Sequence, residues 1–359
     1  MKMAFRFNFS IENRTEVLGN EKLQQELGQE NQEDFPAKSK EVSIEKNILN
    51  QEPLAETPDN VAGQCSLSKL EDTTLPKKHF CPQSAKEHNV PKDVNKVLEN
   101  KIIRTLPGTC HINISVVEAA ELSDGSLGED MVSKSISSHS DLITGVYEGG
   151  LKIWECTYDL MDYLSEADIQ FAHKLVLDLG CGAGLLGIVA LKGNAEGVHF
   201  QDFNSTVIEE ITLPTILVNC AHQDDDIKGF TEPCLKRRKK GDFTQDLLPK
   251  CKFFSGEWSE FSQLLSSNKP FTKYDLILTS ETIYNPNYYE ALHDTLSRLL
   301  ETNGYVYLAS KAHYFGCGGG VLLFTEFIEK KNVFKSRIVK VIDKGLKRFI
   351  IELVFKDSC

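Results

Sequence analysis

The sequence predicts an α/β fold in which a mostly parallel β-sheet ends in an antiparallel hairpin. Strand-like and helix-like apolar segments alternate from residue 174 to residue 330, as in strands joined by right-handed helical crossovers. A glycine-rich turn at residues 180–187 joins the first of these strands to a helix. Near the C-terminus, two strand-like segments at 337–342 and 347–355 are separated by Asp343, Lys344 and Gly345, which indicates a hairpin turn.

A segment of low apolar content precedes this fold. Residues 14–89 are rich in Glu, Gln, Asn, Ser, Lys and Pro, so they bury too little apolar surface to offset the entropy of ordering. We therefore expect a largely disordered acidic region at 1–89, an N-terminal extension of the folded domain at 90–139 and the domain itself at 140–359. Residues 5–11 alternate apolar and polar side chains, which fits a short strand, a docking peptide or a frayed terminus.

Hydrophobic periodicity and the positions of proline and glycine predict the order of the elements. A helix at 91–106, closed by Pro107 and Gly108, and a strand at 111–117 are expected before the main domain. In the main domain we expect helices at 154–164, 185–192, 206–221, 288–300 and 320–330, and strands at 174–179, 197–202, 252–255, 274–280 and 305–309. Pro214 is expected to kink or divide the helix 206–221, and Asn303 and Gly304 to end the helix 288–300.

Charge and cysteine content disfavour some classes of function and some kinds of site. The net charge of −12 disfavours nonspecific binding to nucleic acid and is compatible with basic protein partners. No apolar run reaches the roughly 18 to 20 residues of a membrane span, and no signal peptide opens the chain. The ten cysteines form no CxxC pair and no cluster with metal-ligand spacing. We therefore expect an intracellular protein without a membrane anchor or structural zinc.

The interval 222–250 interrupts the alternation and is expected to be a charged surface loop. It contains a basic run, Lys236, Arg237, Arg238, Lys239 and Lys240. Such a run is typical of nuclear-import signals, so an import receptor is a candidate partner. A contact with an RNA-bearing substrate and a solvated charge cluster are the alternatives. On this basis we expect a cytoplasmic and nuclear location, including the nucleolus.

The glycine-rich turn predicts a nucleotide-like ligand. Its glycines lack a Cβ, so the turn can adopt positive φ and admit ligand atoms close to the main chain, at Gly180, Gly182 and Gly184. Residues 182–187 also match the GxGxxG dinucleotide fingerprint, with Asp202 about 20 residues further on. Asp178, ahead of the glycines, favours another ligand class, because a carboxylate disfavours a pyrophosphate and suits a cationic amino-acid group.

Polar and aromatic residues follow the other predicted strands. Ligands of open α/β sheets bind at the carboxyl ends of the strands, so these residues are binding candidates. Asp202 is expected to accept hydrogen bonds from ribose hydroxyls, Phe203 to pack on an adenine and Trp258 to stack on it. Ser280 and Glu281, after the strand 274–280, mark the expected meeting point of this ligand with an acceptor.

Asp178 and Gly180, an acid-x-Gly pattern, resemble the first motif of class I S-adenosylmethionine-dependent methyltransferases. Jointly with blocks at 140–157, 201–204, 256–258 and 279–286, they resemble the eukaryotic protein-histidine methyltransferases over residues 90–359. The resemblance implies a seven-stranded, Rossmann-like methyltransferase sheet and S-adenosylmethionine as the cofactor. It implies a cofactor site formed by Ile153, Trp154, Glu155, Cys156, Thr157, Gly180, Gln201, Asp202, Phe203, Asn204, Gly256, Glu257, Trp258 and Ser280, to which the glycine-rich turn adds Asp178, Gly182 and Gly184.

The resemblance also implies the acceptor, the τ nitrogen of a histidine in the universal third protein of the large ribosomal subunit. An imidazole, with a pKa of about 6.5, is largely neutral and nucleophilic at pH 7, whereas a lysine, with a pKa of about 10.4, must first lose a proton. The enzyme then needs a group that fixes the tautomer of the acceptor ring. The candidates are Glu281 beside Ser280, then Asp141 and Glu148, with His139 and His313 as alternative proton carriers.

Three other interpretations stay open at this point. The same fold carries lysine and small-molecule methyltransferases, and the GxGxxG spacing fits an NAD-dependent enzyme. A non-catalytic ribosome-assembly adaptor is the third, although such a protein has no physical need for the intact glycines and Asp202. The glycines at 316–320 predict either a mobile lid over the acceptor channel or a tight turn before the next helix.

Overall fold

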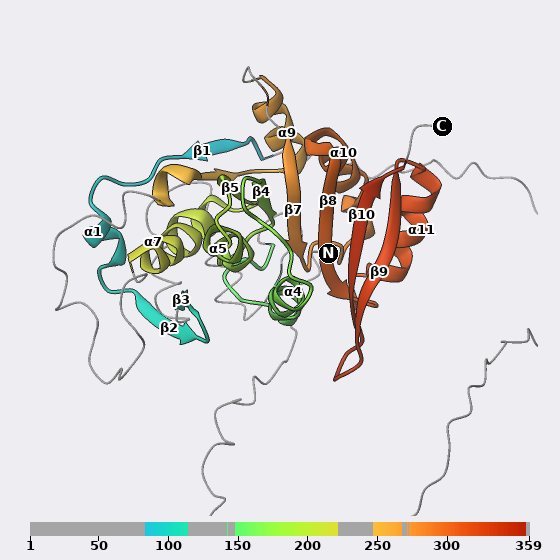
Figure 1. Cartoon of the computed structure of the whole chain (residues 1–359), viewed down its shortest axis with the longest axis horizontal. Coiled ribbons are helices and arrows are strands. Elements are labelled where there is room, and N and C mark those ends of the chain that lie inside the picture. Colours follow the sequence, from blue (N-terminus) through green and yellow to red (C-terminus); the bar gives the residue numbers. More distant parts are fainter. Residues whose placement is uncertain are drawn as a thin grey trace, which may run out of the picture. The chain divides into compact units, whose positions relative to one another are not determined.

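The computed structural model describes residues 83–113, 142, 148–221, 247–267, 271 and 273–356. Within them, one eight-stranded sheet has the order β1-β6-β5-β4-β7-β8-β10-β9 (Figure 1). Its strands are β1 (Lys86–His88), β4 (Leu175–Leu179), β5 (Gly197–Asp202), β6 (Cys251–Ser255), β7 (Tyr274–Ser280), β8 (Leu300–Lys311), β9 (Phe334–Ile342) and β10 (Arg348–Phe355).

The five central strands, β4 to β8, pair in parallel, whereas β1, β9 and β10 pair antiparallel. This confirms the predicted parallel sheet with an antiparallel terminal hairpin. The chain leaves β4 towards β5 and β6, then returns to place β7 on the other side of β4. Such a reversal opens a crevice at the carboxyl ends of the strands, where ligands of α/β sheets bind.

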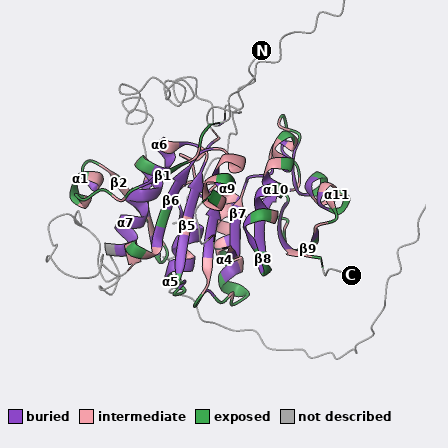
Figure 2. Ribbon diagram, turned by 90° about the horizontal axis from the view of Figure 1, so that it is seen from above, coloured by how far each residue is buried: buried purple, intermediate pink, exposed green. Residues whose placement is uncertain are grey.

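Helices cover both faces of the sheet. α4 (Glu155–Glu166), α5 (Leu185–Lys192) and α7 (Leu213–Ala221) pack on one face through a core that includes Leu160, Leu186 and Leu217. α9 (Trp258–Ser267), α10 (Tyr289–Leu299) and α11 (Val321–Lys331) pack through a second core that includes Phe261, Leu296 and Phe324. Buried residues concentrate on the strands between these layers (Figure 2). None of the helices in the described ranges has the length and apolar character to cross a membrane.

The prediction of one helix over residues 91–106 is wrong, because only residues 94–98 are helical. α1 spans only Val94–Leu98, because Asn100 adopts a left-handed φ of 61° that ends the helix. The β-branched residues that follow form β2 (Ile102–Leu106), which pairs with β3 (Thr109–Asn113). The two strands are joined by a two-residue loop in which Gly108 has a φ of 73°.

The helix predicted at 206–221 is divided, as Pro214 indicated. α6 (Ser205–Val207) leads into a π-helical turn, η1 (Ile208–Thr212), and then into α7. Proline has no N–H to donate, and its ring crowds the carbonyl four residues earlier. A wider turn immediately before Pro214 relieves that conflict. Two short 3₁₀ turns, η3 (Leu248–Lys250) and η4 (Pro286–Tyr288), complete the helical elements of the described ranges.

Two predicted boundaries are wrong. Gly304 does not end a helix: α10 ends at Leu299, and β8 already begins at Leu300. The register with β7 shifts between Tyr274 and Leu276, and a Cβ on Gly304 would lie 3.0 Å from the Asp275 carbonyl oxygen, so the glycine permits an irregularity within the strand. In addition, β1 lies inside the segment predicted as disordered, because its backbone pairs with the edge of β6.

Candidate functional site

Gln201, at the end of β5, connects the loops that follow three neighbouring strands. Its buried side chain donates from Nε2 to the Gly256 carbonyl oxygen at 2.8 Å. Its Oε1 accepts from Trp258 Nε1 at 3.2 Å and lies 3.4 Å from Gly180 N. The predicted cofactor residues after β4, β5 and β6 therefore lie together, in one hydrogen-bonded group.

Asp202 faces the glycine turn. Its Oδ2 accepts from Gly182 N at 3.0 Å, and its Oδ1 accepts from Asn204 N at 3.2 Å. Burial raises the pKa of Asp202 to about 6, and the backbone N–H donors limit that rise. Backbone N–H groups of Gly182, Asn204 and Phe203 bond the carboxylate, which leaves one of its four lone pairs for a ligand. Gly150 passes beside it, since a Cβ there would lie 3.1 Å from Asp202 Oδ2.

The expectation that Asp178 faces a cationic ligand group does not match its position. Its side chain is only 1% exposed, and its Oδ2 accepts from Gly187 N at 2.8 Å. Gly184, the N-cap of α5, has no side chain to satisfy the first N–H groups of that helix, and Asp178 does so from the preceding strand. Burial raises the pKa of Asp178 to about 8. Asp178 therefore stabilises the glycine turn from its buried side.

The glycines of the turn have the conformations expected of them. Gly180 and Gly182 adopt φ values of 67° and 49°, in the left-handed region. Gly187 permits the close helix packing, because a Cβ on it would lie 2.1 Å from a ring carbon of Phe200. The turn thus brings main chain, rather than side chains, to the carboxyl end of β4.

The segment before α4 borders the same loops. Glu148 N donates to Asn204 Oδ1 at 3.2 Å, and Trp154 Nε1 donates to the Gly149 carbonyl oxygen at 3.1 Å. In the first turn of α4, the Thr157 hydroxyl lies 2.8 Å from the Ser280 hydroxyl at the end of β7. This segment therefore connects the loop after β5 to the end of β7, with Ile153, Glu155 and Cys156 between these contacts.

Glu281, the first residue after β7, is part of a buried charged group. It adopts a left-handed φ of 59°, which is uncommon for a residue with a side chain and is often found at functional sites. Lys311 Nζ, at the end of β8, lies 3.1 Å from Glu281 Oε1, and Tyr314 donates its hydroxyl to Oε2. The side chains of Glu281 and Lys311 are 5% and 3% exposed.

Aromatic rings surround this group. Lys311 Nζ lies 5.2 Å from the ring centroid of Trp154 and 5.3 Å from that of Tyr314. The Tyr284 hydroxyl donates to Glu148 Oε2, and the Tyr288 hydroxyl donates to Glu148 Oε1 at 3.0 Å. Burial raises the pKa of Tyr314 well above its usual range, so this hydroxyl stays protonated as a donor. Carboxylates, hydroxyls and aromatic rings therefore lie close together after β7 and β8.

The remaining candidates lie outside the buried charged group, and some of them lie outside the described residues. His313 is exposed, with its ring 5.1 Å from that of Phe315, and does not contact the buried group. Phe203 and Glu257 are half-buried: the Phe203 carbonyl oxygen accepts from Gly256 N at 3.2 Å, and Glu257 N donates to the Gln83 carbonyl oxygen at 3.0 Å. Outside the described residues lie Asp141, His139 and the basic run Lys236, Arg237, Arg238, Lys239 and Lys240.

The glycines at 316–320 form a tight turn, one of the two expected alternatives. Gly319 N donates to the Tyr284 carbonyl oxygen at 2.9 Å, and Tyr314 N donates to the Gly319 carbonyl oxygen at 2.8 Å. A Cβ on Gly319 would lie 2.4 Å from the carbonyl oxygens of Ile283 and Tyr284. The absence of a side chain thus lets this turn pack directly on the loop after β7.

Lys311 and Tyr314 were missed as members of the site. Their sequence signal is a lysine at the end of the otherwise apolar strand 305–310, followed three residues later by a tyrosine. A lysine at the end of a buried strand needs a buried partner. Among the described residues, no group of three or more His, Cys, Asp or Glu side chains could hold a metal ion.

Comparison with known proteins agrees with this geometry. Residues 250–316, which include β6, β7 and β8, match the family model described as lysine methyltransferase. The histidine protein methyltransferase 1 homolog of Bos taurus is 51% identical and aligns over 99% of both chains. The homolog of Dictyostelium discoideum is 39% identical over 60% of this chain and 61% of its own.

A solved structure with similar coverage is the magnesium protoporphyrin IX methyltransferase ChlM from Synechocystis PCC 6803 with bound SAM. It is 17% identical, covers 55% of this chain and 77% of its own, and has a TM-score of 0.36. The full-length similarity to the bovine protein carries the family assignment. This chain therefore belongs to the histidine protein methyltransferase 1 family.

Proposed function

We propose that the loops after β4, β5 and β6 bind S-adenosylmethionine and that the loops after β7 and β8 receive the histidine to be methylated. The family assignment makes the chain a protein-histidine methyltransferase, with S-adenosylmethionine as the methyl donor. The observation that carries the placement is the convergence on Gln201, which joins Gly180, Gly256 and Trp258.

The residues present fit an adenosine-containing sulfonium ligand. Asp202 keeps a lone pair for a ribose hydroxyl, and the glycine turn offers main chain without obstructing Cβ atoms. The Lys152 and Lys311 ammonium groups lie 5.1 and 5.2 Å from the centroid of the Trp154 ring, so this ring already makes two cation–π contacts. The wider set of Ile153 to Thr157, Phe203, Asn204, Glu257 and Ser280 borders the same loops and completes the proposed cofactor site.

The donor supplies an electrophilic methyl group, and the protein has to orient the acceptor ring and exclude water. A neutral imidazole attacks through one nitrogen while its other nitrogen carries a proton. Glu281 is suited to accept a hydrogen bond from that N–H, because Lys311 and Tyr314 hold its carboxylate in place and its Oε1, which pairs with Lys311, keeps a lone pair. Fixing this tautomer directs the lone pair of the other nitrogen toward the methyl group.

Calorimetry and product mapping test this proposal. We expect the full-length protein to bind S-adenosylmethionine and its demethylated product, with no comparable binding of NAD. Fragment mass spectrometry of a methylated protein substrate should place the methyl group on histidine. A methyl group on lysine instead, the residue named by the matching family model, would overturn the acceptor assignment while leaving the fold assignment intact.

We propose that the substrate is a histidine of a basic ribosomal protein, the universal third protein of the large subunit, methylated on the τ nitrogen. The support is the resemblance of the sequence blocks and the net charge of −12, which favours a basic partner. Incubation with labelled donor and separated large-subunit proteins should label this protein alone, and NMR of the product should distinguish the two ring nitrogens. Label confined to other proteins would reject this substrate.

We also propose a cytoplasmic and nuclear location, including the nucleolus, mediated by an import receptor that binds the basic run. The support is the cluster of like charges in residues 236–240. Replacing all five residues by alanine in a fluorescent fusion should remove the nuclear signal. An unchanged distribution would show that the run has no role in import.

A further inference from the structure

A short segment outside the parallel sheet contacts the proposed cofactor site. We call residues 83–89 the strap: they run along the edge of the sheet and include β1. β1 pairs antiparallel with β6, with Lys86 opposite Ser255 and His88 opposite Phe253. Because β6 ends at Ser255, the residues of the strap before β1 reach the loop 256–258, which carries part of the proposed adenine site.

The strap contacts the backbone of that loop. Glu257 N donates to the Gln83 carbonyl oxygen at 3.0 Å. A Cβ on Gly256 would lie 2.6 Å from Ala85 Cα, so the strap backbone passes directly over this glycine. Gly256 has a φ of 118°, a conformation that side chains rarely adopt, and Gln201 binds its carbonyl oxygen. The loop is therefore held between Gln201 and the strap.

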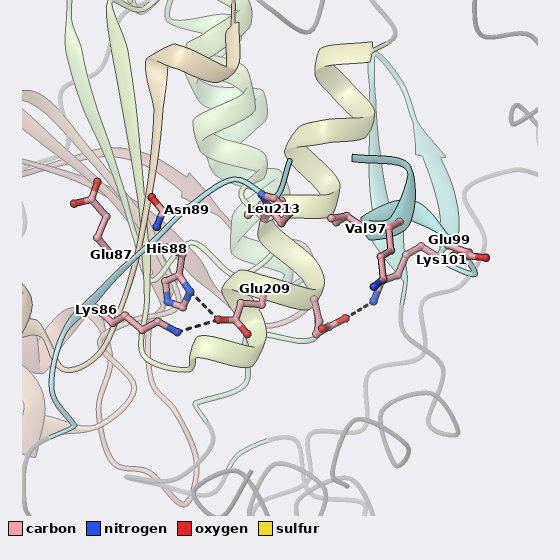
Figure 3. Close-up of a pocket in the computed structure, with 12 residues that line it drawn as sticks. Lys86, Glu87, His88, Asn89, Val97, Glu99, Lys101, Glu209 and Leu213 are labelled. Carbon is pink, nitrogen blue, oxygen red and sulfur yellow. Dashed lines mark hydrogen bonds and ion pairs between the residues drawn. The ribbon is translucent and has the colours of Figure 1, made fainter. Parts of the chain in front are cut away.

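His88 connects the strap to the loops after two strands. Its ring is buried, with a side-chain exposure of 3%. Nε2 lies 2.7 Å from the Ser255 hydroxyl, at the end of β6, and Nδ1 lies 2.9 Å from Glu209 Oε1, in the π-helical turn after β5 (Figure 3). Both ring nitrogens are thus engaged: Ser255 immediately precedes the loop 256–258, and η1, with Glu209, follows the loop after β5.

Polar contacts predominate between the strap and the neighbouring helices. A pocket of about 560 Å³ lies beside it, lined mostly by charged and polar side chains from the strap, α1 and η1. Lys86 also reaches Glu209, at 3.3 Å, but both of these side chains are exposed, at 62% and 48%. An exposed ion pair contributes little, so the buried His88 is the principal side-chain contact that fixes the strap.

We propose that His88 is a positioning residue for cofactor binding: through the strap it holds the loop 256–258 in the conformation that receives the adenine end of the donor. This inference rests on the proposed cofactor site. It extends the site to a segment that precedes the parallel sheet by more than eighty residues of chain, since β4 begins at Leu175 and the strap ends at residue 89. The N-terminal region is thereby coupled to cofactor affinity.

His88→Ala in the full-length protein tests the proposal. We expect the dissociation constant for S-adenosylmethionine, measured by calorimetry, to rise about tenfold through loss of two buried hydrogen bonds. The KM for the donor should rise in parallel, while kcat at saturating donor should stay within about twofold, because the acceptor side is unchanged. Hydrogen exchange of residues 251–258 should become faster in the variant.

Glu87→Ala is the matched control, because Glu87 lies on the same strand, is exposed and is adjacent to His88. It should leave all three measurements unchanged. Ser255→Ala should weaken donor binding, and adding it to His88→Ala should have less than an additive effect, because both remove one shared contact. A loss of kcat without a change in donor affinity, or equal effects of Glu87→Ala, would overturn the proposal.

Asp202→Ala distinguishes a failure of this inference from a failure of the proposed cofactor site on which it rests. If Asp202→Ala weakens donor binding and His88→Ala does not, the cofactor site stands and the role of the strap is wrong. If neither changes the affinity, the cofactor site itself is misplaced. A thermal unfolding curve of each variant without donor shows whether His88→Ala folds, and His88→Gln, which keeps a donor and an acceptor, should recover part of the affinity.

Discussion

The proposed cofactor side and the proposed acceptor side, at the carboxyl ends of the strands, are built from different interactions. On the cofactor side, Asp178, Gln201 and Asp202 bind mainly backbone groups of the loops after β4, β5 and β6. On the acceptor side, side chains bind one another: Glu281 binds Lys311 and Tyr314. Backbone contacts fix the path of a loop, whereas side-chain contacts fix a charge. Substitutions on the cofactor side should therefore change mainly the affinity for the donor. Substitutions on the acceptor side should change mainly kcat.

The sharpest test of this division is Glu281→Gln. We expect kcat to fall by about 10² to 10⁴, the usual contribution of a group that handles a proton in the transition state. The dissociation constant for the donor should change by less than about twofold, because the contacts of Glu281 with Lys311, Tyr314 and Cys156 involve none of the loops after β4, β5 and β6. Steady-state kinetics and calorimetry measure the two quantities.

Glu352→Gln is the control for Glu281→Gln. Glu352 also pairs with a cation, Arg337 at 2.9 Å, but on β10 and away from the crevice. Its loss should leave kcat unchanged. A Glu281→Gln enzyme with normal kcat and weakened donor binding would reverse the assignment of the two sides.

Lys311→Met should destabilise the protein by about 3 to 5 kcal/mol, because it leaves the buried carboxylate of Glu281 without its cation. The double variant Lys311→Met/Glu281→Gln should recover most of this free energy, since no unpaired buried charge remains. Urea denaturation of the three variants measures the free energy of unfolding. Equal stability of the single and double variants would show that the ion pair does not hold the acceptor side together.

The two sides also differ in how far the sequence predicted them. The cofactor side was predictable, because Gly180, Gly182 and Asp202 lie near strand ends and their residue types follow from local backbone needs. The acceptor side was predictable only at Glu281. Lys311 contributes through a contact with a residue 30 positions away, and a contact of that kind has no local periodicity.

The errors in the predicted elements also arise from contacts that leave no signal in the local sequence pattern. The residues 102–106 look helical as a continuation of 94–98, but pairing with 109–113 makes them a strand. His88 belonged to a segment whose composition indicated disorder, yet β6 offers it an edge to pair with. Asp178, at the end of a strand, is predicted to face a ligand, but here a helix with no capping side chain binds its carboxylate. Tertiary partners decided each case.

Asp202→Ala should weaken donor binding by about 1 to 3 kcal/mol, through loss of hydrogen bonds to a charged acceptor and of the contact that holds Gly182. Asp162→Ala, an exposed carboxylate on α4, is the control and should not change the affinity. Calorimetry at pH 7.5, where Asp202 is ionised given its pKa of about 6, measures the difference. Unchanged affinity would show that the ribose acceptor is another residue.

Asp178→Asn should alter the pH dependence of stability. Burial raises the pKa of Asp178 to about 8, so the folded state binds its proton more tightly than the unfolded state, whose pKa is about 3.9. The stability that this proton contributes is complete below about pH 4 and is lost as the pH rises to about 8. Asparagine can still accept from Gly187 N and does not ionise, so the variant should gain stability relative to the wild type between pH 5 and 8, by urea denaturation. A difference that does not vary with pH would show that Asp178 is already ionised in the folded protein at pH 5.

The smallest effect is expected for His313→Ala. The ring of His313 is exposed and lies against Phe315. Both residues immediately precede the tight glycine turn that packs on the loop after β7. An exposed side chain without contact to Glu281 has no path for a proton to the acceptor ring, so kcat should change by less than about threefold and its pH profile should keep its shape. That profile should fall below about pH 6.5 in both enzymes, because the acceptor imidazole becomes charged. If His313→Ala instead removes the acidic limb, the acceptor side extends to this turn, and proton handling belongs to the surface of the protein rather than to its buried carboxylate.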